Sequence, residues 1–144
     1  MFSPSFASAF GQPNAMALAY HRMGAETGVV DATPHKLVEM LFDGYVDSLT
    51  QARGALRLGE IESKGRAFGR AARIVEEGLK AGLNLEQGGR LALDLNALYT
   101  YLTLRLTLAN LRNDESILNE CLSLMEPVRS AWKAIGPQVN GRAN

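Results

Sequence analysis

Residues 90–111 read RLALDLNALYTYLTLRLTLANL and contain neither proline nor glycine. At about 100° per residue, this segment predicts one long helix with two apolar lines. The first line holds Leu91, Leu95, Leu98, Leu102 and Ala109. The second lies roughly 140° away and holds Leu93, Ala97, Tyr101, Leu104, Leu108 and Leu111. A bundle helix needs only one apolar face, so the second line predicts contact with another helix, the N-terminal segment or a partner. A helix buried at the centre of the fold would explain both lines equally well.

The composition favours helices throughout the chain. Leucine occurs 21 times, against 11 for valine and isoleucine together, and no proline lies between Pro34 and Pro127. Leucine suits helices, whereas β-branched residues suit sheets. Because the expected connections are short, we predict an all-α, antiparallel up-and-down four-helix bundle over residues 33–135.

Two helices are expected before residue 90. Thr33 and Pro34 are a capping hydroxyl and a first-turn proline, and Gly59 stands where a helix from Pro34 would end. The second helix is expected over 60–81. Its inward-facing residues are predicted to be Ile61, Phe68, Ala72, Val75 and Leu79.

A last helix is expected after residue 112. Asn113 and Asp114 offer a cap, and the apolar spacing continues to about Ile135. Pro127 lies inside this helix, where it predicts either a kink or a break into two shorter helices.

The two ends of the chain differ from the bundle. Residues 1–32 carry few charges, and a short helix there would place Met16, Tyr20 and Met23 on one face. We expect 1–32 to be a flexible, partly disordered arm able to cap an apolar groove, and 136–144 to be a flexible tail.

Charge and cysteine content limit the possible partners and compartments. The 15 lysines and arginines balance 15 aspartates and glutamates, so nucleic acid is not an expected partner. The single cysteine, Cys121, cannot form an internal disulfide, which favours a reducing compartment. No apolar run approaches 20 residues and no Sec signal is recognisable, so we expect a cytoplasmic protein without membrane insertion.

The sequence offers few groups for catalysis. His21 and His35 belong to no metal-binding pair of the Glu-x-x-His type, so we expect no metal, no cofactor and no enzyme activity. Cys121 lies on an apolar stripe, where cysteine usually packs as a small hydrophobe. A phosphotransfer module with His35 as acceptor is an alternative, although His35 stands at a first turn rather than mid-helix. A scaffold bundle with another protein partner is a second alternative.

A basic row lies on the second expected helix and holds Lys64, Arg66, Arg70 and Arg73. Glu62 and Glu77 each stand four residues from a member of the row, so ordinary helix-surface pairs are expected to neutralise part of it. No aromatic residues interleave the row, which favours a solvated face over a nucleic-acid site.

Glycines inside the expected helices favour a binding module. They are Gly44, Gly54, Gly65, Gly69 and Gly78. A glycine in a helix interior costs close to ~1 kcal/mol relative to alanine, so their number suggests closely approaching backbones or grooves between helices. Such grooves fit an amphipathic helix from a partner.

Several motifs together resemble the FliS family of flagellar secretion chaperones. After Tyr20, residues 29–44 read VVDATPHKLVEMLFDG, and shorter motifs follow in the family's order. These are KG at 64–65, RIV at 73–75, LEQGG at 85–89, LNALY at 95–99, ANLRND at 109–114 and AW at 131–132. The resemblance covers about Tyr20 to Trp132. Its signature positions are Thr33, Pro34, Leu37, Leu41, Asp43, Gly44, Asn110, Asp114 and Trp132.

The resemblance implies a four-helix bundle without catalytic activity that binds the C-terminal, otherwise disordered segment of flagellin in the cytosol. Binding would prevent premature polymerisation and deliver flagellin to the type III export gate. The groove expected to hold flagellin contains Leu93, Ala97, Tyr101, Leu104 and Leu108. The arm, through Tyr20, Met16 and Met23, is expected to contact the export-gate protein. A homodimer is possible when no client is bound.

Overall fold

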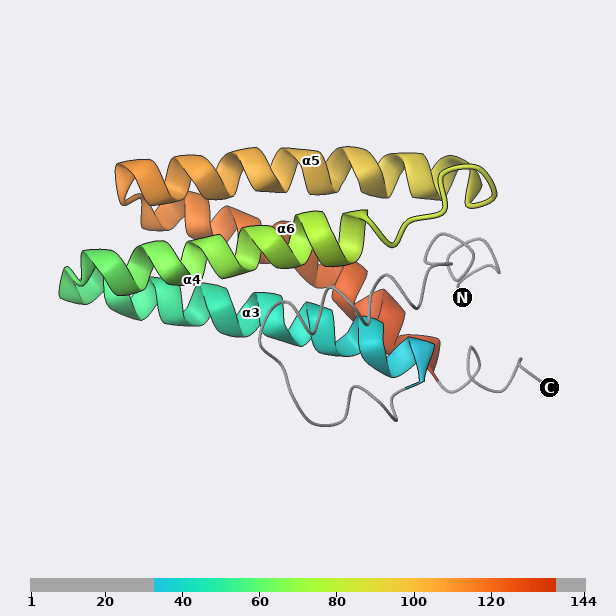
Figure 1. Cartoon of the computed structure of the whole chain (residues 1–144), viewed down its shortest axis with the longest axis horizontal. Coiled ribbons are helices and arrows are strands. Elements are labelled where there is room, and N and C mark those ends of the chain that lie inside the picture. The colour runs from blue at the N-terminus through green and yellow to red at the C-terminus, as the bar shows by residue number, and fades with distance from the viewer. Residues whose placement is uncertain (1–32, 137–144) are drawn as a thin grey trace.

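The described helices form a closed ring in which each one packs on the next. In this computed structural model, which describes residues 33–136, α3 (Pro34–Leu58) lies beside α4 (Ile61–Arg73), and α4 continues into the wide-turn helix η1 (Ile74–Lys80). α5 (Gly89–Arg112) packs on α4 and η1, while α6 (Glu115–Ala134) packs on α5 and returns to α3. Figure 1 shows that successive helices run in opposite directions. The predicted all-α four-helix bundle is confirmed, with α4 and η1 together as its second helix.

The helix ends follow the capping residues of the sequence. The Thr33 hydroxyl accepts a hydrogen bond from the Lys36 amide at 3.1 Å, and Pro34 is the first helical residue. Gly59 ends α3 with a φ of 74°, a left-handed conformation that glycine adopts without strain. Asp114 caps α6 by accepting from the amides of Ser116 and Ile117. The predicted starts and ends of these helices are therefore right to within one or two residues.

The second helix departs from regular α geometry in its last two turns. Residues 74–80 form a π-helix, which the sequence did not predict. Here the chain packs very closely on α3, because a Cβ added at Gly78 would lie 3.0 Å from Leu41 Cδ2. Wide turns of this kind are rare and have no periodicity of their own that a short segment could reveal.

Pro127 does not break the last helix. α6 is continuous from Glu115 to Ala134, so the predicted alternative of two shorter helices is wrong. Proline removes the hydrogen bond to the carbonyl four residues earlier, and that residue, Ser123, is exposed. Water can therefore satisfy this carbonyl, which lowers the cost of the proline.

The core is built from one face of each helix. Tyr45, Phe42 and Tyr99 are its largest fully buried side chains. The Tyr45 hydroxyl donates to the Cys121 carbonyl at 3.1 Å. Ile61, predicted to face inward, is 60% exposed because it begins α4 beyond the end of the core. Ala72 is half-buried and packs against the core from its edge.

Candidate functional site

The two apolar lines of α5 have different environments. Leu95, Tyr99, Leu102 and Leu106 are buried against the other helices. Leu93, Tyr101 and Leu104 are 54%, 42% and 63% exposed, and Ala97 is exposed as well. α5 is therefore not a central helix enclosed on all sides, and most of its second line is left uncovered by residues 33–136.

Leu108 differs from the other members of the second line. It is half-buried and packs against the core cluster. Leu111, at the end of the same line, is 76% exposed. The apolar surface on α5 therefore consists of Leu93, Ala97, Tyr101 and Leu104, with Leu108 at its inner border. We call these five residues the α5 outer face.

A polar cluster joins the middle of this face to α6. The Tyr101 hydroxyl donates to Glu120 Oε2 at 2.6 Å, and Arg105 Nε donates to Glu120 Oε1 at 2.9 Å. The hydrogen bond to Glu120 raises the pKa of Tyr101, and the Tyr101 and Arg105 donors lower the pKa of Glu120. Because its hydroxyl is hydrogen-bonded to Glu120 of α6, the Tyr101 ring is held in one place on the surface. Glu120 was not identified from the sequence, where its partners are 15 and 19 residues away.

Threonines flank the α5 outer face without making it strongly polar. The hydroxyls of Thr100, Thr103 and Thr107 each donate to the backbone carbonyl four residues earlier in α5. A hydroxyl that is bonded within its own helix has less need of water or a partner. Leu124 of α6, 36% exposed, adds further apolar surface outside α5.

The candidate catalytic groups lie in structural positions. His35 is buried, its ring stacks on Trp132 with 5.0 Å between centroids, and Trp132 Nε1 donates to the His35 carbonyl at 3.0 Å. A buried, stacked ring is poorly placed to accept a phosphoryl group, which argues against the phosphotransfer alternative. Cys121 is buried, and burial raises the pKa of its thiol to about 12, so it is a core residue as predicted. Within residues 33–136, no three His, Cys, Asp or Glu side chains come together to form a possible metal site.

The signature positions of the sequence motifs serve the fold. Leu37 and Leu41 are buried, and Gly44 leaves room for Ile74, whose Cδ1 would lie 3.3 Å from a Cβ there. Asp43 pairs with Arg129 at 3.0 Å, and the Asn110 carbonyl accepts from Lys64 Nζ at 2.8 Å. Thr33 and Pro34 begin α3, Asp114 caps α6, and Trp132 joins α6 to the start of α3 through His35.

The basic row of α4 is not uniformly solvated. Lys64 is only 6% exposed and its Nζ also donates to Asn113 Oδ1, so its prediction as a surface residue was wrong. It satisfies carbonyl groups at the end of α5, which no local pattern reveals. The pairs expected from Glu62 and Glu77 do not form in the described helices.

The helical glycines have different surroundings. Gly44 and Gly78 lie where α3 and η1 approach closely, whereas Gly54 and Gly65 have nothing within 4 Å of an added Cβ. Close approach therefore explains only part of the set of helical glycines.

The residues predicted for the arm, Met16, Tyr20 and Met23, lie outside the described residues.

No helix in the described ranges has the length and hydropathy to cross a membrane.

Comparisons with known proteins place these features in a family. The family model described as flagellar protein FliS matches residues 16–139. A flagellar secretion chaperone FliS of Salmonella typhimurium is 43% identical over 122 residues, covering 85% of this chain and 90% of the relative. FliSB of Pseudomonas aeruginosa, also named a flagellar secretion chaperone, is 41% identical over 81% of this chain and 91% of its own. The FliS chaperone of Bacillus subtilis is 30% identical over 75% of this chain and 79% of its own.

Proposed function

This chain belongs to the FliS family of flagellar secretion chaperones, and we propose that it binds the C-terminal segment of flagellin on the α5 outer face. The observation that carries the proposal is the exposure of Leu93, Tyr101 and Leu104 on a helix whose opposite face already fills the core. Exposed apolar residues grouped on one helix commonly mark a protein interaction site.

The chemistry of this face fits a disordered client that folds on binding. Ordering such a client costs about 2 to 5 kcal/mol of free energy, and burial of a large apolar area compensates for this cost. An amphipathic helix laid along α5 would cover Leu93, Ala97 and Tyr101 in turn, because they are spaced by four residues. A fixed Tyr101 ring loses little conformational freedom on contact, which favours binding.

The wider role is proposed from the membership in the FliS family. We propose that covering the segment in the cytoplasm prevents flagellin from polymerising prematurely, and that the complex is then delivered to the flagellar export gate. The function requires no cofactor, no nucleic acid and no enzyme activity. The arm residues Met16, Tyr20 and Met23 are proposed to contact the gate protein, and a client-free homodimer would cover the same apolar face.

The direct test places a charge in the α5 outer face. Leu104→Glu should weaken binding of a peptide of the last forty or so flagellin residues by at least about tenfold, because a carboxylate must then be desolvated in an apolar contact. Isothermal titration calorimetry measures the affinity, and thermal melting checks the fold.

Leu58→Glu is the matched control, since Leu58 is 74% exposed at the end of α3. It should leave the affinity unchanged. Equal losses in the two variants, or full binding by Leu104→Glu, would contradict the proposed site.

The arm supplies a second test. If residues 1–19 cover the α5 outer face when no client is bound, their deletion removes a competitor. Flagellin-peptide affinity should then be unchanged or tighter in the same titration. A large loss of affinity would instead mean that the arm contributes directly to client binding.

A further inference from the structure

Three arginines of α4 have no ionic partner among residues 33–136. Arg66, Arg70 and Arg73 follow one side of the helix at intervals of four and three residues. None of them pairs with a carboxylate in the described structure, and Arg66 makes only a 3.3 Å hydrogen bond to the Ser63 hydroxyl. Several cations elsewhere on the bundle have such partners, as Arg57 has in Glu115 and Arg129 in Asp43. The described part of the chain therefore does not pair these three charges internally.

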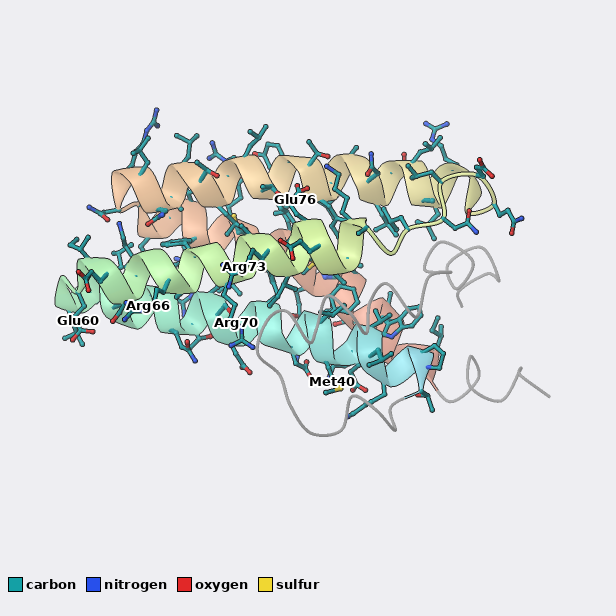
Figure 2. The ribbon with its side chains drawn as sticks, in the orientation of Figure 1. Met40, Glu60, Arg66, Arg70, Arg73 and Glu76 are labelled. Carbon is teal, nitrogen blue, oxygen red and sulfur yellow. The ribbon has the colours of Figure 1, made fainter. Side chains whose placement is uncertain are left out.

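The first two arginines line a cleft between α3 and α4. Its volume is about 390 Å³, and Gln51 and Ser63 add neutral polar groups to its wall. Figure 2 shows Arg66 and Arg70 over the seam between the two helices and Arg73 on the adjoining face of α4. The cleft therefore combines two guanidinium groups with hydrogen-bonding side chains, and a third guanidinium stands next to it.

Glycines position the second and third of these arginines. Arg70 Nη2 lies 4.0 Å from the place of a Cβ at Gly44, so the side chain reaches across to α3 where that helix has no side chain. Arg70 Nε is shielded from water without a hydrogen-bond partner. Arg73 Nη1 lies 3.8 Å from the place of a Cβ at Gly69. Contact with the helix surfaces restricts both side chains, which lowers the entropy lost when they bind an anion.

Carboxylates limit the length of the positive region. Glu60 lines one end of the cleft, while Glu76 and Glu77 follow Arg73 at the other end. From Arg66 to Arg73 the helix rises about 10 Å. A long polyanion such as a nucleic acid would meet these acids on both sides, whereas a short peptide with a few carboxylates would not. In an extended chain, alternate residues are about 7 Å apart and face the same side, which is close to the rise of about 6 Å from Arg66 to Arg70. The step from Arg70 to Arg73 is shorter, about 4.5 Å, so the long Arg73 side chain would have to reach along the helix to a third carboxylate.

We propose that the α3–α4 cleft binds an acidic segment of a protein partner, in which carboxylates on alternate residues of an extended chain pair with Arg66, Arg70 and Arg73. The site is independent of the α5 outer face, since it lies on other helices. It is therefore a second interaction surface beyond the flagellin site proposed above.

The test uses a fluorescein-labelled peptide of four alternating glutamate and serine pairs and the full-length protein. Fluorescence anisotropy at low salt should show binding, and the same peptide with glutamines should not bind. The triple variant R66Q/R70Q/R73Q should weaken binding by about tenfold, because each exposed ion pair contributes only a modest binding free energy. The triple variant K36Q/R90Q/R112Q removes three exposed charges elsewhere and should bind nearly as the wild type does.

Two further measurements keep the outcome clear. Melting curves establish that each variant folds, and the single variants R66Q, R70Q and R73Q replace the triple variant if it does not. An eight-residue thymidine oligonucleotide serves as the competing polyanion. Equal weakening by the two triple variants, binding of the glutamine peptide, or tighter arginine-dependent binding of the oligonucleotide would each overturn the proposal.

Discussion

The two faces of α5 have similar composition but different roles. Leu102 is fully buried in the bundle, while Leu104, two residues later, is 63% exposed. The bundle encloses one leucine-rich face and leaves the other open, so the hydrophobicity of this helix exceeds what its own core uses. An apolar face on a helix therefore indicates a contact but not whether the contact lies inside the protein.

The largest difference between buried and open positions should appear in thiol reactivity. Cys121 is buried and its pKa is raised to about 12, so it should react with Ellman's reagent at pH 8 at least about a thousandfold more slowly than in the unfolded chain. Leu104→Cys, made in a Cys121→Ala background, should react nearly as fast as a free thiol. Rapid labelling of native Cys121 would show that the core opens easily.

A second difference should appear in stability. Leu102→Ala should lower the free energy of unfolding by about 2 to 5 kcal/mol, because it leaves a cavity among buried side chains. Leu104→Ala removes the same atoms from an exposed position and should change it by less than about 0.5 kcal/mol. Urea denaturation measures both values. Similar losses would mean that Leu104 is also packed within the fold.

The smallest effect concerns the polar cluster beside the α5 outer face. Hydrogen bonds from Tyr101 and Arg105 lower the pKa of Glu120 below its ordinary value of 4.5. A carboxyl with a lowered folded-state pKa stabilises the protein above its ordinary pKa, and this contribution is lost as the pH falls through the folded-state value. Tyr101→Phe should therefore lower Tm slightly at pH 7 and progressively less as the pH falls below 4.5.

The matched variant for this prediction is Arg105→Gln, which removes the other donor to Glu120. Its lowering of Tm relative to wild type should show the same dependence on pH. A Tm difference between Tyr101→Phe and wild type that is equal at pH 7 and pH 3 would rule out Glu120 as its cause.

Local signals predicted the helices well. Thr33, Gly59 and Asp114 act on groups within one turn of themselves, so their effects can be read without knowing the fold. The two lines of α5 were also visible, because side-chain direction around a helix depends only on residue spacing.

Long-range contacts could not be predicted in the same way. Lys64 is buried because the end of α5, 46 residues away, offers it a carbonyl acceptor. The π-turns of η1 occur where Gly78 meets Leu41 of another helix. Within residues 33–136, Arg66 and Arg73 form no ion pair with Glu62 and Glu77, although these glutamates stand at a favourable spacing in the sequence.

The helix class, the capped ends, the second apolar line and the resemblance to FliS chaperones could all be read from the sequence. Each of these depends on residue identity and short spacing, which remain the same whatever packs nearby. The packed fold was needed to learn that Leu104 faces solvent while Leu108 touches the core, and that His35 stacks on Trp132. It also showed that three arginines at the α3–α4 cleft form no ion pair within residues 33–136. Burial and pairing depend on which distant segments the fold brings into contact, and that information is absent from local spacing.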